Sequence, residues 1–288
     1  IKVRVGRFAP SPTGPLHMGS LITALASFLD IKHRQGQWSI RIDDLDYPRN
    51  HPEGTKTILE SLKQHGLYSD TRIIYQSQNL ANYEKAISQL DSSLFVCICT
   101  RKSLAGSPRY PGTCRDKELS IVDAAIRIKT PDKKVAFIDK IKGRIETHLS
   151  QDIGDFILVR KDKIFSYNLA TALDDGGDMI TDVLRGEDLL PLTNQQIFLM
   201  NELNLDPPEY AHIPVLCHPD GTKLSKQSGA KPLNNKTAIE NILFAMKLLG
   251  LKPPTHISNI FSLIEWAIAN WTTDNLPNKF QPYQQANG

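Results

Sequence analysis

A histidine, a glycine and a serine stand together in the tetrad His17-Met18-Gly19-Ser20, at the start of a predicted helix. The tetrad follows a predicted strand and a turn rich in proline and glycine, RFAPSPTGPL. Gly19 leaves room for a base or ribose against the backbone, the helix N-terminus favours an anion, and an imidazole there can donate to a phosphate oxygen. Taken alone, the tetrad also fits an ordinary capping or surface histidine.

Two lysines lie in a second motif near the other end of the chain, Gly221-Thr222-Lys223-Leu224-Ser225-Lys226-Gln227. A flexible loop with this composition can close on a polyphosphate and stabilise the charge that builds on a leaving pyrophosphate. An ordinary exposed loop is the alternative for this segment by itself. The two motifs in this order, around a predicted α/β sheet, indicate ATP chemistry.

Three cysteines could bind a metal. Cys97 and Cys99 are two residues apart in the strand-like FVCIC, so both thiols would lie on one face, and Cys114 follows after a loop. Three thiols suit Zn²⁺, and the alternative is three buried structural thiols. Cys217 is remote in sequence and is predicted to be a small apolar core residue.

A tetrahedral zinc site needs a fourth ligand. The sequence has no histidine between His65 and His148, and Tyr110, four residues before Cys114, is the nearest candidate. Water and Asp116 remain alternatives. A closed site of this kind would be structural.

The elements that must position these residues alternate between strands and helices at first. That order predicts a parallel, doubly wound sheet. From Phe95 to about Leu158 the alternation stops, which indicates an insertion. Expected strands are Lys2–Phe8, Trp38–Ile42, Arg72–Tyr75 and Ile180–Leu184; expected helices are Gly19–Arg34, Gly54–His65, Asn82–Leu90 and Leu192–Leu203, with a hairpin over Phe156–Leu169 and further helices from Asn235 onward.

Charge is segregated along a chain whose net charge is only +3. Residues 101–144 carry 12 Lys/Arg against 5 Asp/Glu, whereas residues 145–230 carry 6 against 14. The first segment could steer phosphates, or it could be a solvated lysine-rich surface. No window approaches the roughly 18 apolar residues of a membrane span, and the first residues lack a signal-peptide core, so we expect a cytoplasmic protein without membrane contact.

The two phosphate motifs resemble the HIGH-type and KMSKS-type sequences of class I aminoacyl-tRNA synthetases. Four blocks, the first of which includes the His17 tetrad, resemble the glutamyl branch of that family: RFAPSPTGPLHMGS at 7–20, RIDDLDYPR at 41–49, FSYNLATALDD at 165–175 and LRGEDLL at 184–190. The resemblance spans about residues 3–230. It implies a Rossmann-like doubly wound parallel sheet with a zinc-bearing insertion and a short helical C-terminal region.

The resemblance also implies roles for individual residues. Arg7 would bind the side-chain carboxylate of the amino acid, and Asp43 its ammonium group, although the family usually has the longer glutamate at that position. His17 and Lys226 would be the catalytic phosphate contacts. The full amino-acid site would be Arg7, Ala9, Ser11, Asp43, Tyr167 and Arg185; the ATP site would be His17, Gly19, Lys223 and Lys226; the metal ligands, as in the short enzymes of this branch, would be Cys97, Cys99, Tyr110 and Cys114.

The C-terminal part of the sequence helps to predict which molecule accepts the activated amino acid. After Gln227, 61 of the 288 residues remain, whereas a full glutamyl enzyme has an anticodon-binding region there. The short paralogues of this architecture transfer glutamate onto queuosine in the anticodon loop of tRNA(Asp). We therefore expect a monomer that uses ATP with Mg²⁺, L-glutamate and queuosine-containing tRNA(Asp), with one structural Zn²⁺ per chain.

The expected domains follow from these assignments. Residues 1–94 would form the first half of the catalytic domain, 95–158 the zinc-bearing insertion, 159–230 the second half with the lysine loop, and 231–288 a helical region without an anticodon-binding domain. The alternatives are a truncated glutamyl-tRNA synthetase that charges a tRNA 3′ end, a nucleotidyltransferase with a small-molecule acceptor, and an inactive RNA-binding paralogue.

Overall fold

The computed structural model describes residues 3–177, 179–224 and 229–280. Its strands are β1 (Val5–Phe8), β2 (Gln37–Ile42), β3 (Ile74–Tyr75), β4 (Leu94–Cys97), β5 (Ala125–Ile128), β6 (Lys134–Asp139), β7 (Gly143–His148), β8 (Phe156–Val159), β9 (Asp182–Gly186) and β10 (Glu209–Ile213). Its α-helices are α1 (Met18–His33), α2 (Gly54–Gln64), α3 (Leu80–Gln89), α4 (Tyr167–Asp175), α5 (Leu190–Glu202), α6 (Ala238–Leu248) and α7 (Ile260–Ala269). Among the described residues, no helix is both long and apolar enough to cross a membrane.

The chain divides into two compact units. The first unit contains the described residues of Ile1–Tyr75, Ile180–Leu189 and Glu209–Gly288, and the second contains those of Gln76–Met179 and Leu190–Pro208. Each unit is therefore assembled from segments that are separate in the sequence.

The first unit is built on a parallel sheet. Its strands run in the order β3-β2-β1-β9-β10, and every neighbouring pair in this series is parallel. Numbered by their order along the unit, the strands read 3-2-1-4-5, so the order reverses between β1 and β9. In doubly wound folds, ligands bind outside the carboxyl ends of the strands at such a reversal. The α/β fold predicted from the sequence is confirmed.

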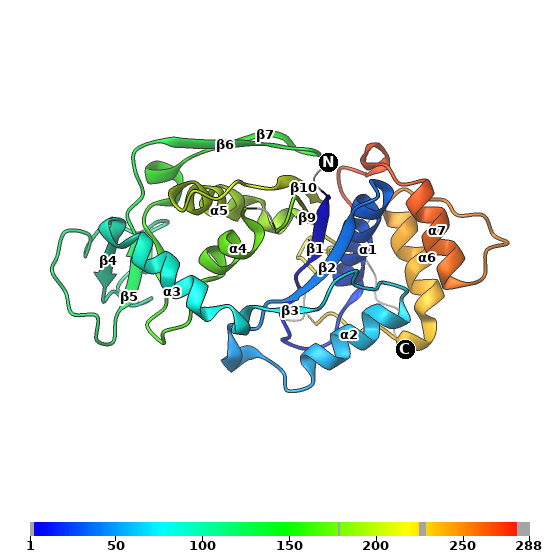
Figure 1. The fold of residues 1–288 in the computed structure, drawn as a ribbon, viewed down its shortest axis with the longest axis horizontal. Helices are drawn as coiled ribbons and strands as arrows, with labels where there is room; N and C mark the ends of the chain where they lie inside the picture. Colours follow the sequence, from blue (N-terminus) through cyan, green and yellow to red (C-terminus); the bar gives the residue numbers. More distant parts are fainter. Residues whose placement is uncertain (1–2, 178, 225–228, 281–288) are drawn as a thin grey trace. The chain divides into compact units, whose positions relative to one another are not determined.

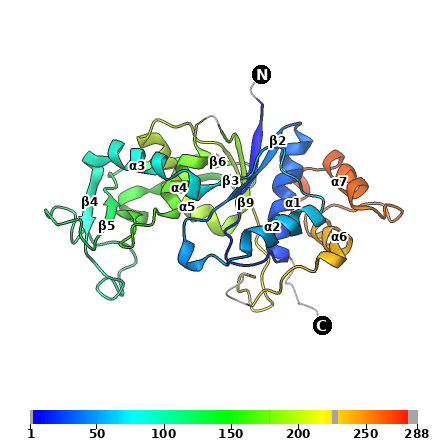
Figure 2. The same ribbon diagram turned by 60° about the horizontal axis from the view of Figure 1, so that its bottom comes forward.

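Helix α1 covers this sheet and is buried along most of its length. It contacts β1, β2 and β9, and on its other side α6 and α7 pack against it (Figures 1 and 2). Trp38 of β2 is fully buried beneath α1, where its indole nitrogen donates to the Ser27 hydroxyl at 3.0 Å and its ring meets Phe28 edge to face. This packing holds α1, the helix that follows β1, against the sheet.

The second unit combines antiparallel strands with helices. Strands β4, β5 and β8 form one antiparallel sheet in that order, and β6 and β7 form a hairpin. Helix α4 packs against both α3 and α5 (Figure 1). The carboxylate of Asp174 in α4 accepts from Gln76, Asn79 and Tyr83 at 2.7, 2.7 and 2.8 Å, which fastens α4 to the segment around α3.

Two expectations about local structure differ from the observed elements. The expected hairpin over Phe156–Leu169 is limited to β8 and a single bridge between Val159 and Phe165, because the Ser166 hydroxyl accepts from the Leu169 backbone and caps α4. Strand β10 was not predicted. It is the fifth of the parallel strands and pairs with β9.

A network of charges lies at the amino ends of β1, β9 and β10, opposite the carboxyl ends. Asp182 is buried and accepts from Arg4 at 2.9 Å and from Arg34 at 2.6 Å. Arg4 also pairs with Glu209 at 2.9 Å, and these two carboxylates raise the pKa of Arg4 above its usual value. One buried carboxylate therefore ties together two strands and the end of α1.

We expect Asp182→Asn to lower the free energy of unfolding by about 2 kcal/mol or more, because two arginines lose their buried charged partner. Urea unfolding followed by tryptophan fluorescence measures this, since Trp38, Trp266 and Trp271 all belong to the first unit. Glu53→Gln is the matched control, because the exposed Glu53 carboxylate pairs with the exposed Lys56. Equal stabilities of the two variants would contradict the assignment.

Candidate active site and metal site

Most of the residues predicted to bind amino acid and ATP lie at or just beyond the carboxyl ends of β1, β2 and β9. Arg7 is buried in β1, Asp43 directly follows β2, and Arg185 is buried near the end of β9. Ala9 and Ser11 lie in the loop after β1. These positions surround the reversal in strand order, which is where this fold class binds its ligands.

Backbone hydrogen bonds to neighbouring segments hold the loop after β1 in place. The Pro10 carbonyl accepts from the Asp43 backbone at 3.0 Å, and the Pro12 carbonyl accepts from the His51 backbone at 2.8 Å. Gly54 packs directly on Pro12, and a Cβ at Gly54 would overlap the Pro12 carbonyl oxygen. The loop that carries Ala9 and Ser11 is therefore fixed between β2 and the start of α2.

His17 occupies the N-cap of α1. Its Nδ1 accepts from the Ser20 backbone at 3.3 Å, and its Nε2 lies 3.1 Å from the Ser20 hydroxyl. Because a backbone N–H can only donate, Nδ1 is the acceptor and Nε2 carries the proton of the neutral ring. A Cβ at Gly19 would lie 3.1 Å from the His17 ring and 3.7 Å from the Leu224 carbonyl oxygen, so the structure brings the two phosphate motifs together.

The second motif is described only as far as Leu224. Lys223 pairs with Asp188, which follows β9, at 2.6 Å, and the Leu224 backbone donates to Leu216 at 2.7 Å. Lys226 lies outside the described residues. Cys217, expected in the core, is only half-buried and forms a backbone bridge with Lys223.

A buried ion pair involves the residue expected to bind the substrate ammonium. Arg41 donates to Asp43 through Nε at 2.7 Å and Nη2 at 3.3 Å, with both side chains buried. Arg41 was not singled out from the sequence, although its spacing of two from Asp43 in a strand-like run would have placed both on one face. Asp43 is thus oriented by a strand neighbour.

Tyr167 belongs to the second unit. It is the first residue of α4, and its side chain is 37% exposed. Its role in the amino-acid pocket stays a prediction, as do the roles of the other residues in that pocket.

The three cysteines expected to bind metal come together in the second unit. The Sγ atoms of Cys97, Cys99 and Cys114 all lie within 4.8 Å of one another, with Cys99 and Cys114 at 3.6 Å. The Tyr110 hydroxyl lies 3.5 Å from Cys97 Sγ and 3.9 Å from Cys99 Sγ. Ligands about 2.3 Å from a tetrahedral zinc ion are about 3.8 Å apart, so these spacings fit a metal site. The Asp116 carboxylate is not part of the cluster.

Hydrogen bonds within the cysteine cluster favour the thiolate form of Cys114. Burial alone would raise the pKa of Cys114, but hydrogen bonds from Tyr110, the Ile98 backbone and Cys99 outweigh it and lower that pKa to about 7. Burial and the thiols of Cys97 and Cys114 raise the pKa of Tyr110. The Arg127 guanidinium stacks on the Tyr110 ring at 4.0 Å, which fixes the ring plane beside the thiols.

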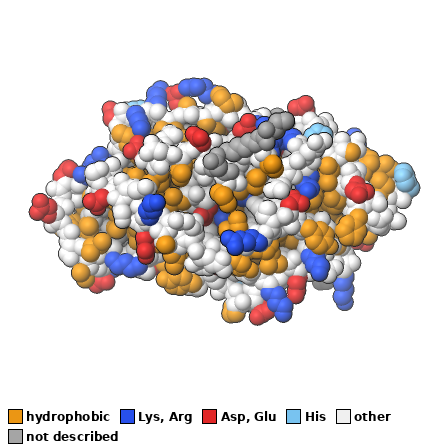
Figure 3. All heavy atoms as spheres, viewed as in Figure 1, with side chains coloured by type: hydrophobic (Ala, Val, Ile, Leu, Met, Phe, Trp, Pro, Cys, Tyr) orange, Lys and Arg blue, Asp and Glu red, His pale blue; other side chains and the backbone are white. Residues whose placement is uncertain are grey.

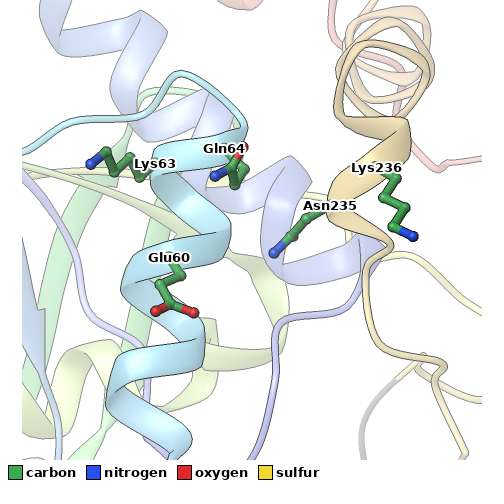
Figure 4. A pocket seen from close by; sticks show the side chains of 5 residues that line it. All are labelled: Glu60, Lys63, Gln64, Asn235 and Lys236. Carbon is green, nitrogen blue, oxygen red and sulfur yellow. The ribbon is translucent and has the colours of Figure 1, made fainter.

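An open groove of about 550 Å³ lies elsewhere in the first unit. It is lined by Glu60, Lys63 and Gln64 of α2 and by Asn235 and Lys236. Figure 4 shows Asn235 reaching toward α2, where Ser61 donates to it at 2.9 Å, while Lys63 and Lys236 point away on either side. The groove contains none of the predicted site residues.

Comparison with known proteins shows the family to which the chain belongs. The family described as tRNA synthetases class I (E and Q), catalytic domain, matches residues 2–240. The chain belongs to this family. Two relatives described as glutamyl-Q tRNA(Asp) synthetase are those of Pseudomonas aeruginosa, 39% identical over 278 residues and 95% of each chain, and of Methylococcus capsulatus, 42% identical over 94% of this chain and 92% of the relative.

A solved structure supports the class I synthetase fold. The crystal structure of glutamate-tRNA synthetase from Elizabethkingia anophelis superposes with a TM-score of 0.80 at 25% sequence identity, over 99% of this chain and 68% of that one. The prediction of a class I synthetase of the glutamyl type is confirmed at the level of the family.

We expect Gly54→Ala to displace the loop after β1 and to lower amino-acid-dependent ATP–pyrophosphate exchange by about tenfold or more, because positioning errors of about 1 Å are costly in a synthetase site. Lys56→Ala, an exposed change in the same helical turn, is the control. Wild-type exchange by Gly54→Ala would show that the loop position does not matter to the reaction.

Proposed function

We propose that this class I synthetase activates L-glutamate with ATP and transfers it to the queuosine of tRNA(Asp). The observation that carries the proposal is the full-length similarity to relatives of that description, aligned over 95% of this chain and of the Pseudomonas aeruginosa protein. The arrangement of charged residues at the carboxyl edge of the parallel sheet supports the activation step.

In the first step, an oxygen of the glutamate α-carboxylate attacks the α-phosphorus of Mg·ATP. A bond forms from that oxygen to phosphorus, and the bond to pyrophosphate breaks. The His17 Nε2–H and the ammonium groups of Lys226 and Lys223 would stabilise the phosphate charge, while Gly19 leaves room for the nucleoside. Catalysis then consists of positioning and charge stabilisation, with no protein nucleophile.

Glutamate recognition would use opposite charges already present in the first unit. The guanidinium groups of Arg7 and Arg185 suit the carboxylates of the amino acid, because each offers a planar fork of donors. Asp43, oriented by Arg41, would face the ammonium group. Ala9 and Ser11 lie in the fixed loop after β1, and the family resemblance assigns Tyr167 to the amino acid as well.

In the second step, a queuosine hydroxyl attacks the activated glutamyl carbonyl and AMP leaves. The basic segment 101–144 lies in the second unit and would contact the RNA phosphates. Part of its charge is already compensated, because Arg115 pairs with Asp155, and Lys134 and Arg144 share Glu146. On the face in Figure 3, basic and acidic side chains are intermixed. Arg101, Lys102 and Lys117 remain exposed near the cysteine cluster.

The test separates activation from acceptor choice. Glutamate-dependent ATP–pyrophosphate exchange without tRNA should be measurable for the wild type and reduced by about 100-fold in Lys226→Ala, which removes a charge-stabilising group. Radiolabelled glutamate should then be transferred to tRNA(Asp) that contains queuosine and not to the same tRNA without it. Equal labelling of both would reject the queuosine acceptor and favour charging of the 3′ end; absence of exchange would favour an inactive paralogue.

We also propose that the cysteine cluster binds one Zn²⁺ with Tyr110 as the fourth ligand. The ligand spacings fit a tetrahedron, and a bound cation would favour the thiolate and phenolate forms. The ion would have a structural role, because it would close the loop between Cys99 and Cys114 onto β4.

We expect about one zinc per chain in purified wild-type protein and nearly none in Cys114→Ser, measured by plasma mass spectrometry, because a structural site needs all its thiolates. Cys217→Ser, which changes a cysteine outside the cluster, should keep its zinc. Tyr110→Phe should lose zinc to a chelator faster than wild type. Equal rates would leave water as the fourth ligand, and retention of zinc by Cys114→Ser would reject the site.

A further inference from the structure

A histidine that the sequence motifs do not include lies beside Arg185. Arg185 in β9 and His212 in β10 are directly paired in the register of these parallel strands. Both side chains are buried, and His212 is fully inaccessible to solvent. The Arg185 Nε–H donates to His212 Nε2 at 3.0 Å.

This hydrogen bond determines the state of the imidazole. Because an arginine nitrogen can only donate, Nε2 must carry a lone pair, and the proton of the neutral ring lies on Nδ1. The imidazole stacks on Tyr210, with ring centroids 6.0 Å apart and planes 16° apart. Tyr210 is itself buried and also lies under the Arg185 guanidinium at 5.4 Å. The acceptor is therefore held in a fixed place.

An acceptor at Nε sets the direction of the whole guanidinium group. Nε lies in the guanidinium plane, so a bond to it restricts rotation of that plane and aims both Nη groups. A guanidinium group whose donors are already oriented loses less rotamer entropy when it binds a carboxylate. A neutral imidazole does this without neutralising the arginine, whereas a carboxylate partner, as Asp43 is for Arg41, also compensates the charge.

We propose that His212 is a positioning residue, which orients Arg185 for a carboxylate of the substrate glutamate. The inference rests on the proposed function, because it takes Arg185 as part of the amino-acid pocket. It adds a residue from β10, the parallel neighbour of β9, to the recognition of the amino acid. His212 would touch no substrate atom itself.

The competing explanation is a histidine that only satisfies core packing, and the first unit offers a matched example. His65 is also fully buried; its Nδ1 lies 2.7 Å from the Ser61 carbonyl, and its Nε2 lies 3.0 Å from Asn241 Nδ2. It lies at the end of α2, away from the carboxyl ends of the strands. His65→Phe is therefore the control for loss of a buried, hydrogen-bonded histidine.

The experiment measures KM for glutamate, KM for ATP and kcat in pyrophosphate exchange. His212→Phe keeps a ring against Tyr210 but removes the acceptor, and we expect a rise of about tenfold in the glutamate KM with the ATP KM within about twofold. His212→Gln keeps an acceptor and should recover most of this loss. His65→Phe should leave the glutamate KM unchanged. If His212→Phe does not fold, His212→Met takes its place, because its flexible apolar side chain adapts to irregular space.

An unchanged glutamate KM in the Phe or Met variant would overturn the proposal. So would equal rises in both KM values, or a Gln variant no better than Phe, because these results would reflect general damage to the fold. If the wild type itself shows no glutamate-dependent exchange, the proposed function fails, and that result is distinct from a wild type that exchanges normally beside an unaffected His212→Phe.

Discussion

Parallel strands all end at the same edge of their sheet, and in this protein the order of the strands reverses between β1 and β9. The chain therefore continues from β1 to β2 in one direction along the sheet and reaches β10 from β9 in the other. The phosphate motif follows β1, Asp43 follows β2, and Arg185 lies near the end of β9, so one topological constraint brings together residues from distant parts of the sequence. The close packing of Gly54 on Pro12 then fixes the loop after β1.

Two of the buried charged side chains in this region, Asp43 and Arg185, are each oriented by a neighbouring side chain. Arg41 belongs to β2 and Asp43 directly follows that strand, whereas Arg185 and His212 face each other on two neighbouring strands. Burial of charge is costly unless hydrogen bonds compensate it, so these pairs also restrict the conformations that the site can adopt. The exposed pair of Lys223 and Asp188 is different, because the lysine belongs to a loop beyond the strands.

The sequence predicted those features that are encoded by a few neighbouring residues, and it did not predict pairings between remote segments. The β1–α1 turn, the helix at Met18–His33 and the cysteine cluster were predicted, because Gly and Pro, apolar spacing and a Cys-x-Cys pattern all act over a few residues. Strand β10 and the pairing of Arg185 with His212 were missed, because EYAHI has no clear alternation and its partner strand is remote in sequence. The N-cap at Ser166 is also encoded locally. It was nevertheless missed, because Phe165 and the residues before it favoured a hairpin. The assigned binding roles of Arg7, Asp43 and Lys226 still depend on the family resemblance.

The discontinuity of the first unit has a consequence for how the protein folds. Strand β1 obtains β2 as a neighbour within the first 42 residues, but the strand on its other side, β9, ends at Gly186. Until that point of synthesis, β1 has an open edge that can pair with other chains, and the centre of the sheet cannot close. Contacts at such large sequence separation also slow folding, since the loop must be closed before pairing stabilises it. The second unit, most of which precedes β9 in the chain, is made before the sheet is complete.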